Sequence, residues 1–143
     1  MSSAILVCTH GHTSEQMIKT AEMIVGLQEN IGFVNFVPGE NTEDLTKKYV
    51  KALRELDSSQ GVLVMVDIFG GSPFNAIAPL AYGDANIEVI TGVNIPMLLE
   101  AFILRESLDL KELLESARTS GVNGITILEK NLDVVEVEKE DEL

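Results

Sequence analysis

Short apolar runs alternate along the chain with longer segments of helical periodicity, and this alternation constrains the fold more than any other feature of the sequence. Strands are expected at residues 4–8, 33–37, 62–66 and 87–90. Residues 62–66 are apolar at every position, which is typical of a parallel strand covered on both faces. Alternating strands and helices with short connections predict a doubly wound α/β fold. This is a three-layer sandwich around an open, mainly parallel sheet of strand order 2-1-3-4.

Helices are expected after each strand. One helix is expected to begin at Thr13 and another at Ser72. Further helices are expected at residues 42–56, whose apolar stripe includes Tyr49, and at residues 96–105 and 110–120. Thr13 and Gln16 have the spacing of a capping box, and Gly26 is expected to end the first helix. Ser72 is expected to cap the third helix, with Pro73 in the first helical position, where the missing proline N–H costs nothing.

The 143 residues are expected to form a single domain, residues 1–143, because no linker, repeat or low-complexity stretch divides them. Residues 124–128 and 134–137 are expected to be extended, and the acidic residues 138–143 are expected to fray. The first residues lack the basic region of a secretory signal, and no apolar stretch is long enough to cross a bilayer. We therefore expect a cytoplasmic protein.

The charge balance restricts the class of partner. The chain has 23 acidic and 10 basic residues, a formal net charge of −13, which disfavours nucleic-acid binding because that rests on cationic side chains. An acidic surface would attract basic partners or serve solubility alone, and both interpretations stay open. The single cysteine, Cys8, excludes an internal disulfide and lies in an apolar run, which predicts a buried thiol in a reducing compartment.

Unusual loops follow three of the expected strands. They are Thr-His-Gly-His-Thr at residues 9–13, Asp-Ile-Phe-Gly-Gly-Ser-Pro at residues 67–73 and Thr-Gly-Val-Asn-Ile-Pro at residues 91–96. In an open parallel sheet, ligands bind beyond the carboxyl ends of the strands, where the strand order reverses. Strands one and three are neighbours in the order 2-1-3-4, and we therefore expect His10 and Asp67 to face one crevice.

The pair of His10 and Asp67 suits nucleophilic catalysis. A carboxylate that accepts a hydrogen bond from Nδ1 of an imidazole fixes the tautomer and leaves Nε2 nucleophilic. The product would be a phosphohistidine, and Gly70 and Gly71 can bring backbone N–H groups close to its oxygens at the start of a helix. Ser72 adds a hydroxyl. This chemistry requires no metal and no cofactor.

Each of these residues also has a simpler interpretation. A histidine near a strand end is often a packed or capping residue, and Asp67 could cap a turn. The loop at residues 70–73 could be only a tight turn that starts a helix. His12 is the rival nucleophile, although its position just before Thr13 predicts a solvent-exposed ring. The convergence of three loops on one edge of the sheet favours the catalytic interpretation.

Four blocks of sequence resemble the IIA domain of mannose-family bacterial sugar phosphotransferase systems. They are Thr-His-Gly at residues 9–11, Val-Pro-Gly-Glu-Asn at 37–41, Asp67 with Gly-Gly-Ser-Pro-Phe-Asn at 70–75, and Gly-Val-Asn-Ile-Pro-Met at 92–97. The resemblance covers about residues 4–130 and keeps the order and spacing of all four blocks.

The resemblance implies a phosphoryl relay. In this family the protein HPr, in its phosphorylated form, donates to the IIA histidine, here His10, on Nε2. The IIA component then passes the group to the IIB component, which phosphorylates a sugar as it crosses the membrane through IIC and IID. Asp67 matches the carboxylate that orients the histidine. Gly71 and Ser72 match the phosphoryl-binding loop of the family, and we expect the phosphate-binding site to comprise Gly11, Gly70, Gly71 and Ser72.

The family is homodimeric, with a C-terminal strand that is exchanged between subunits and paired antiparallel. The extended segments after Gly124 could supply that strand. The best-known relatives are fused to a IIB domain through an Ala/Pro-rich linker, which this sequence lacks, and we expect a stand-alone subunit with a separate IIB chain. Ile68 and Phe69 occupy a stretch that varies in the family and are expected to have no role. The sugar cannot be deduced from the sequence.

Other functions compete with this interpretation. The phosphotransfer subunit of a dihydroxyacetone kinase would use the same mechanism. A flavodoxin-like cofactor-binding protein would need aromatic walls, for which only Phe69 and Tyr82 are candidates. A histidine phosphatase would need arginines around the phosphate, and no arginine lies in the three loops. A receiver domain would need acidic residues where Thr9 and His10 stand.

Overall fold

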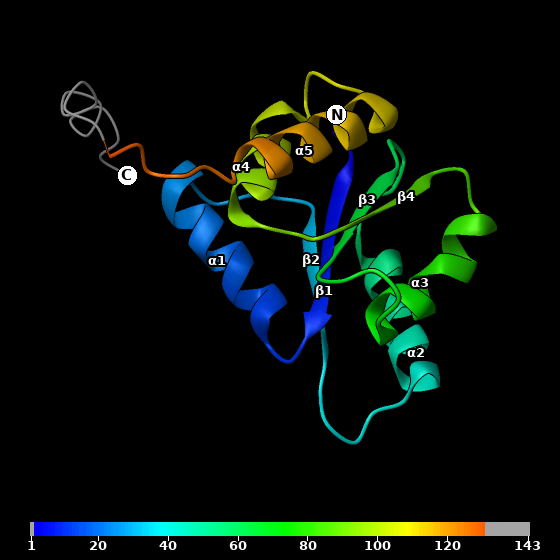
Figure 1. Cartoon of the computed structure of the whole chain (residues 1–143). Helices are drawn as coiled ribbons and strands as arrows, with labels where there is room; N and C mark the ends of the chain where they lie inside the picture. The colour runs from blue at the N-terminus through cyan, green and yellow to red at the C-terminus, as the bar shows by residue number, and fades with distance from the viewer. Residues whose placement is uncertain (1, 131–143) are drawn as a thin grey trace.

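In the described part of the chain, four parallel strands form the centre of the fold, and five helices connect and cover them (Figure 1). The computed structural model describes residues 2–130. The strands are β1 (Ala4–His10), β2 (Ile31–Phe36), β3 (Val62–Val66) and β4 (Ile87–Thr91), in the order β2-β1-β3-β4. The helices are α1 (Thr13–Val25), α2 (Thr42–Glu55), α3 (Ser72–Tyr82), α4 (Ile95–Leu104) and α5 (Leu110–Asn123). The predicted α/β class and strand order are confirmed.

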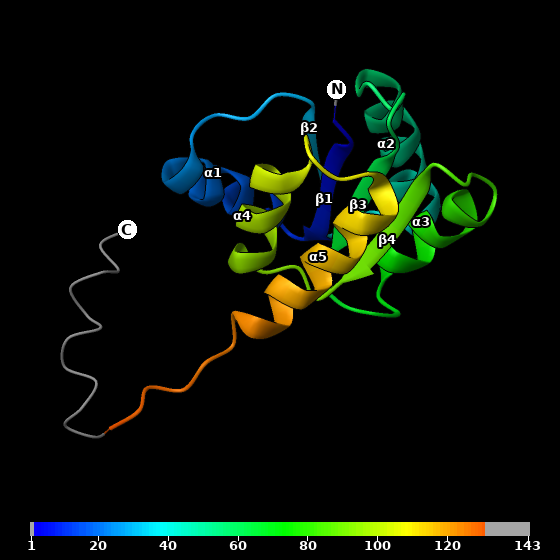
Figure 2. The ribbon, with the colours of Figure 1, turned by 90° about the horizontal axis from the view of Figure 1, so that it is seen from above.

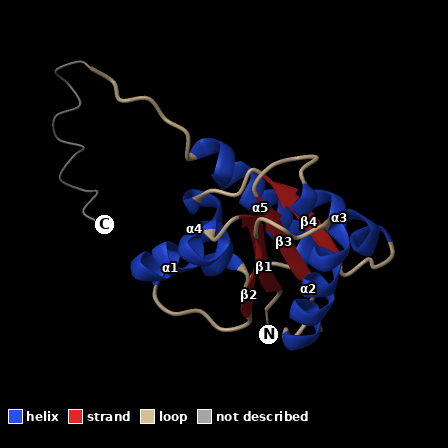
Figure 3. Cartoon of the chain, turned by 90° about the horizontal axis from the view of Figure 1, so that it is seen from below, coloured by secondary structure: helices blue, strands red, loops and turns tan. Residues whose placement is uncertain are grey.

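Two apolar cores lie on opposite faces of the sheet, and helices cover both of these faces (Figures 2 and 3). Helices α1, α4 and α5 pack on the face that carries Ile5, Val7 and Met65. Helices α2 and α3 pack on the other face, which includes Cys8 and Val64. Coverage on both sides explains why β3 is apolar and buried at every position. The Cys8 thiol is fully buried, and this burial raises its pKa to about 12.

The register of the sheet determines where the functional loops leave it. Cys8 of β1 pairs with Val66 of β3, so His10 lies two residues beyond that pair and Asp67 lies one residue beyond it. On the other side of β1, His10 itself pairs with Phe36, the last residue of β2. Parallel strands end at the same edge, and this register therefore brings the three residues to one site.

The predicted side-chain caps of two helices are wrong. Helix α1 begins at Thr13, but its N-cap is His12, which makes no side-chain cap bond. The Thr9 hydroxyl accepts from the Ser14 N–H instead, at 2.8 Å. Helix α3 begins at Ser72, but its N-cap is Gly71, so that Ser72 is the first helical residue. Both helices therefore start without a cap from the residue that local spacing favoured.

Helix α5 runs to Asn123, three residues beyond its expected end, with Gly124 as its C-cap. Residues 125–130 follow as exposed chain without regular secondary structure and lead away from the sheet (Figure 2). No strand is therefore present where residues 124–128 were expected to be extended. The segments predicted at 134–137 and 138–143 lie outside the described residues. Among residues 2–130, no helix is both long enough and apolar enough to cross a membrane.

A buried arginine closes the edge of the domain opposite the functional loops. Arg105, just after α4, is only 5% exposed. Its guanidinium donates to the backbone oxygens of Glu29 at 2.6 Å, Asn30 at 3.4 Å and Ser3 at 3.5 Å, and to Gln28 Oε1 at 3.2 Å. Arg105 thus joins the end of α4 to the loop between α1 and β2 and to the start of β1.

Candidate functional site

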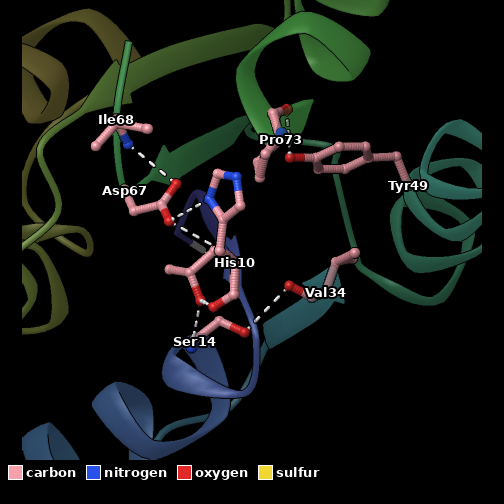
Figure 4. Close-up of polar contacts among 8 residues, drawn as sticks. His10, Ser14, Val34, Tyr49, Asp67, Ile68 and Pro73 are labelled. Carbon is pink, nitrogen blue, oxygen red and sulfur yellow. Dashed lines mark hydrogen bonds and ion pairs between the residues drawn. The ribbon is translucent and has the colours of Figure 1, made fainter. Parts of the chain in front are cut away.

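The site is built around His10, the last residue of β1, and Asp67, the first residue after β3 (Figure 4). Asp67 Oδ2 lies 2.8 Å from His10 Nδ1 and 2.9 Å from the His10 backbone nitrogen. The His10 side chain is 47% exposed, whereas that of Asp67 is 25% exposed. The structure therefore brings together the two residues that the sequence placed at one edge, and it leaves the imidazole open to a partner.

The protonation state of Asp67 decides the tautomer of the imidazole. Partial burial acts to raise the pKa of Asp67, but hydrogen bonds from the backbone and ring of His10 and from the Ile68 N–H outweigh it. The net effect holds the pKa of Asp67 below its ordinary value. The carboxylate is therefore ionised near neutral pH and accepts the proton of Nδ1. This leaves the lone pair of the neutral imidazole on Nε2.

Phe36 and Gly71 confine the His10 ring. The ring of Phe36 meets the imidazole edge to face, with centroids 5.7 Å apart. A Cβ on Gly71 would lie 3.0 Å from His10 Cε1, closer than such atoms ordinarily approach. Gly71 therefore lies close to the Cε1 edge of the imidazole. Glycine is needed at this position for close approach rather than for an unusual backbone angle.

The loop before α3 supplies the positive end of a helix beside the imidazole. Gly70 has φ +81°, in the left-handed region that favours glycine, and its carbonyl accepts from Asn75 Nδ2 at 3.0 Å. The buried Tyr49 hydroxyl donates to the carbonyl of Pro73 at 2.9 Å and ties this first turn to α2. The first N–H groups of a helix have no intrahelical acceptor and favour an anion. The loop can therefore bind phosphoryl oxygens next to His10.

The Gly11 N–H is already engaged in the sheet. It donates to the carbonyl of Phe36 at 2.7 Å, and Gly11 has φ +63°. This amide could bind a phosphate only after releasing its present bond, so its assignment to the phosphate-binding site stays a prediction.

His12 has different partners from His10. Its exposed side chain has Nδ1 3.0 Å from Asn35 Nδ2, and Asn35 Oδ1 in turn accepts from the Ser14 hydroxyl at 2.7 Å. The rival histidine thus contacts a neutral amide, and among residues 2–130 no carboxylate lies within ion-pair distance of its ring. Stabilisation of positive charge on the ring therefore favours His10 as the nucleophile.

The third predicted loop supports the site through the backbone. The Gly92 N–H donates to the carbonyl of Asp67 at 3.1 Å, and the Val93 N–H donates to that of Val66 at 3.1 Å. Sequence reasoning missed Phe36 and the buried hydroxyl of Tyr49. Only the position of Phe36 at the end of a strand beside β1 could have indicated it. Within the described part of the chain, no three His, Cys, Asp or Glu residues lie close enough together to hold a metal ion.

Known proteins are similar to this chain in sequence and in fold. The model of the EIIA-man family, described as the PTS system fructose IIA component, matches residues 4–118. The mannose-specific EIIAB component of Escherichia coli K12 is 48% identical over 131 residues, which are 90% of this chain and 40% of that protein. The chain therefore spans less than half the length of that relative.

Two further relatives are matched over nearly their whole length. The fructose-specific EIIA component of Bacillus subtilis is 33% identical over 138 residues, which cover 96% of this chain and 94% of that protein. The crystal structure of the phosphotransferase system component EIIA from Streptococcus agalactiae superposes with a TM-score of 0.79 at 28% identity. That match covers 87% of this chain and 95% of the other. Family model and relatives agree, and the chain belongs to the EIIA-man family of phosphotransferase-system IIA components.

Proposed function

We propose that this protein is a phosphoryl carrier of a sugar phosphotransferase system. His10 accepts a phosphoryl group from phospho-HPr on Nε2 and passes it to a IIB component, which serves sugar uptake through the membrane components IIC and IID. The observation that carries the proposal is the 2.8 Å contact of His10 Nδ1 with the ionised Asp67, beside the amides that begin α3. Membership of the EIIA-man family supports the same role.

The proposed step exchanges one P–N bond for another. The lone pair of His10 Nε2 attacks the phosphorus of the donor's phosphohistidine, and the donor's P–N bond breaks with its electron pair returning to the donor imidazole. The positive charge that develops on the His10 ring is stabilised by the carboxylate of Asp67. Transfer to IIB repeats the step with His10 as the leaving group. No water, metal or cofactor enters the reaction.

The phosphoryl oxygens would be held by the loop before α3. The backbone N–H groups of Gly70, Gly71 and Ser72 and the Ser72 hydroxyl supply donors there, together with the positive end of the helix. These groups would position the phosphoryl group in line with the incoming nitrogen. Transfer between such sites depends mainly on position and on charge stabilisation.

The alternatives agree less well with the site. A flavodoxin-like cofactor site would need aromatic walls at the loops, but Tyr82 lies at the last residue of α3, away from His10. A phosphatase would need a cationic phosphate site, and Arg105 is committed to carbonyl groups at the opposite edge of the sheet. A dihydroxyacetone kinase subunit would differ only in the acceptor of the group, and an assay with IIB distinguishes it.

We also propose that residues 1–143 act as one domain and that the protein works as a homodimer with an exchanged C-terminal strand. A relay that starts from phosphoenolpyruvate would run in the cytoplasm, and we place the protein there. The match covers 40% of the mannose-specific EIIAB relative. Phosphoryl-transfer assays with candidate IIB proteins would identify the IIB partner and the sugar.

Incubation with enzyme I, HPr and labelled phosphoenolpyruvate tests the proposal. We expect one acid-labile phosphate per chain, released when IIB is added. The variant His10→Ala should take up no label, whereas His12→Ala should label like the wild type, because the ring of His12 contacts the neutral amide of Asn35 and not a carboxylate such as Asp67. Label that persists in His10→Ala and disappears in His12→Ala would overturn the assignment.

A further inference from the structure

Two large apolar side chains are exposed on the loop between β3 and α3, directly after Asp67. Ile68 is 55% exposed and Phe69 is 77% exposed. The sequence suggested no role for either residue. In the fold, however, they occupy the same edge of the sheet as His10, and exposed apolar side chains next to a reactive group commonly mark a binding surface.

Ile68 borders the imidazole itself. A Cβ built on Gly71 would lie 3.0 Å from His10 Cε1 and 3.1 Å from Ile68 Cγ1, so both side chains lie against the same side of that glycine. Phe69 is supported from behind by Phe74 of α3, with ring centroids 4.6 Å apart. A ring that is backed by another ring and still mostly exposed presents its outer surface to solvent at little conformational cost.

The segment that carries this pair has no charged residue after Asp67. From Ile68 to Gly83 the sequence has no Asp, Glu, Lys or Arg, although the chain as a whole has 23 acidic and 10 basic residues. Asp67, which precedes the pair, already accepts hydrogen bonds from His10 and from the Ile68 N–H. Next to the nucleophile, a strongly acidic protein therefore exposes two large apolar side chains on an uncharged segment.

We propose that Ile68 and Phe69 form the apolar centre of the surface that binds the phosphohistidine-bearing donor protein. The proposal rests on the proposed carrier function. Direct transfer between two imidazoles requires the donor to cover His10, and the side chains that border His10 must then lose their contact with water. The matching surface of the donor is apolar around its own phosphohistidine, because a charged surface would be desolvated against Phe69 without a partner.

Burial of this pair serves the chemistry as well as the affinity. Apolar contact stabilises the encounter in proportion to the area removed from water, and large aromatic side chains near the centre of an interface contribute most. The same contact excludes water from the breaking P–N bond, which directs the phosphoryl group to His10 Nε2 rather than to hydrolysis.

The chain offers a matched control for Phe69. Tyr82 is 93% exposed and is the last residue of α3, the helix that follows the same loop. The length of α3 places it about 15 Å from the start of that helix at 1.5 Å per residue. Removal of either aromatic ring changes the exposed apolar surface by a similar amount, but only Phe69 lies at the proposed binding surface.

The test measures the initial rate of labelling as a function of phospho-HPr concentration for the wild type, Phe69→Ser, Ile68→Ser and Tyr82→Ser. We expect KM for phospho-HPr to rise about tenfold or more in Phe69→Ser and severalfold in Ile68→Ser, with Tyr82→Ser unchanged. The final extent of labelling at saturating donor should stay at one phosphate per chain in all four proteins.

Three results separate this proposal from the carrier function. A KM for Phe69→Ser equal to that of Tyr82→Ser would overturn the docking surface while His10 still labels. A lower sedimentation mass for Phe69→Ser would assign the pair to contacts between copies of the chain and would also overturn it. Absence of label in the wild type would instead contradict the carrier function itself.

Discussion

One carboxylate oxygen of Asp67 accepts hydrogen bonds from two different donors of His10. Oδ2 accepts from the ring Nδ1 at 2.8 Å and from the backbone nitrogen of the same residue at 2.9 Å, while Oδ1 accepts from the Ile68 N–H at 3.0 Å. The ring is therefore fixed relative to the end of β1 as well as to the carboxylate. This double contact makes Asp67 the residue whose substitution is most informative.

Replacement of Asp67 by Asn should slow phosphoryl transfer by about a hundredfold or more. The amide preserves the size of the side chain, but it removes the negative charge and can donate to Nδ1, which would move the ring proton to Nε2. Rapid-quench labelling from phospho-HPr measures the rate. The His10→Ala variant sets the background, and a rate within twofold of the wild type would contradict the proposed role of the carboxylate.

The stability that Asp67 contributes should depend on pH. Its pKa in the folded protein is lowered, so this contribution is fully present above the pKa of an unfolded aspartate, about 3.9, and is lost as the pH falls through the folded-state pKa. Urea unfolding of the wild type and Asp67→Asn checks this. The difference in the free energy of unfolding between the two proteins should shrink as the pH falls below about 4. A difference that grows as the pH falls below about 4 would show that the sign is wrong.

Addition of one methyl group to Gly71 should impair transfer. The new Cβ of Gly71→Ala would lie 3.0 Å from His10 Cε1, so the ring or the loop must move, and we expect the transfer rate to fall about tenfold or more. The backbone of Gly71 has φ −77°, which alanine adopts without strain, and the melting temperature should change little.

Gly83→Ala is the matched control for that substitution. Its added Cβ would meet nothing closer than 3.7 Å, at the end of α3 remote from the imidazole. Equal rates for the Gly71→Ala and Gly83→Ala variants would show that the close approach to His10 has no consequence for transfer.

Loss of the buried guanidinium should destabilise the domain without touching the site. Arg105→Met removes the guanidinium donor of the Glu29 carbonyl oxygen and one of the two donors of the Asn30 carbonyl oxygen, which also accepts from the Ile5 N–H, and we expect a loss of about 2–4 kcal/mol in the free energy of unfolding. Arg118→Met should cost less than about 0.5 kcal/mol, because the ion pair of Arg118 with Glu115 is exposed. Urea denaturation measures both, and similar losses in the two variants would contradict the structural role of Arg105.

The sheet and its reactive edge could be predicted because apolar runs mark the strands and the loops that follow these runs are visible in the sequence. A fully apolar run as short as residues 62–66 is typical of a strand covered on two faces, and the loops that follow parallel strands lie at one edge of the sheet. That reasoning placed His10 beside Asp67, and the structure has them in contact.

The remaining features depend on side chains that meet only in the folded chain. The spacing of Thr13 and Gln16 indicated a local cap, but the Thr9 hydroxyl reaches Ser14 across the turn at Gly11. Tyr49 was read as an apolar position of α2, and its hydroxyl finds the carbonyl of Pro73 only after α2 and α3 pack. The exposure of Phe69 likewise follows from the shape of the loop, which periodicity does not describe.

Because Nδ1 is hydrogen-bonded to Asp67, the imidazole of His10 offers only Nε2 to both protein partners of the proposed relay. Phospho-HPr and IIB must therefore bind one after the other. Under this scheme, a large surplus of spent HPr would compete with IIB for the loaded carrier and return the group to where it came from. The ratio of the concentrations of unphosphorylated HPr and IIB in the cell, and not the affinity of either protein alone, would then set the flux through the carrier.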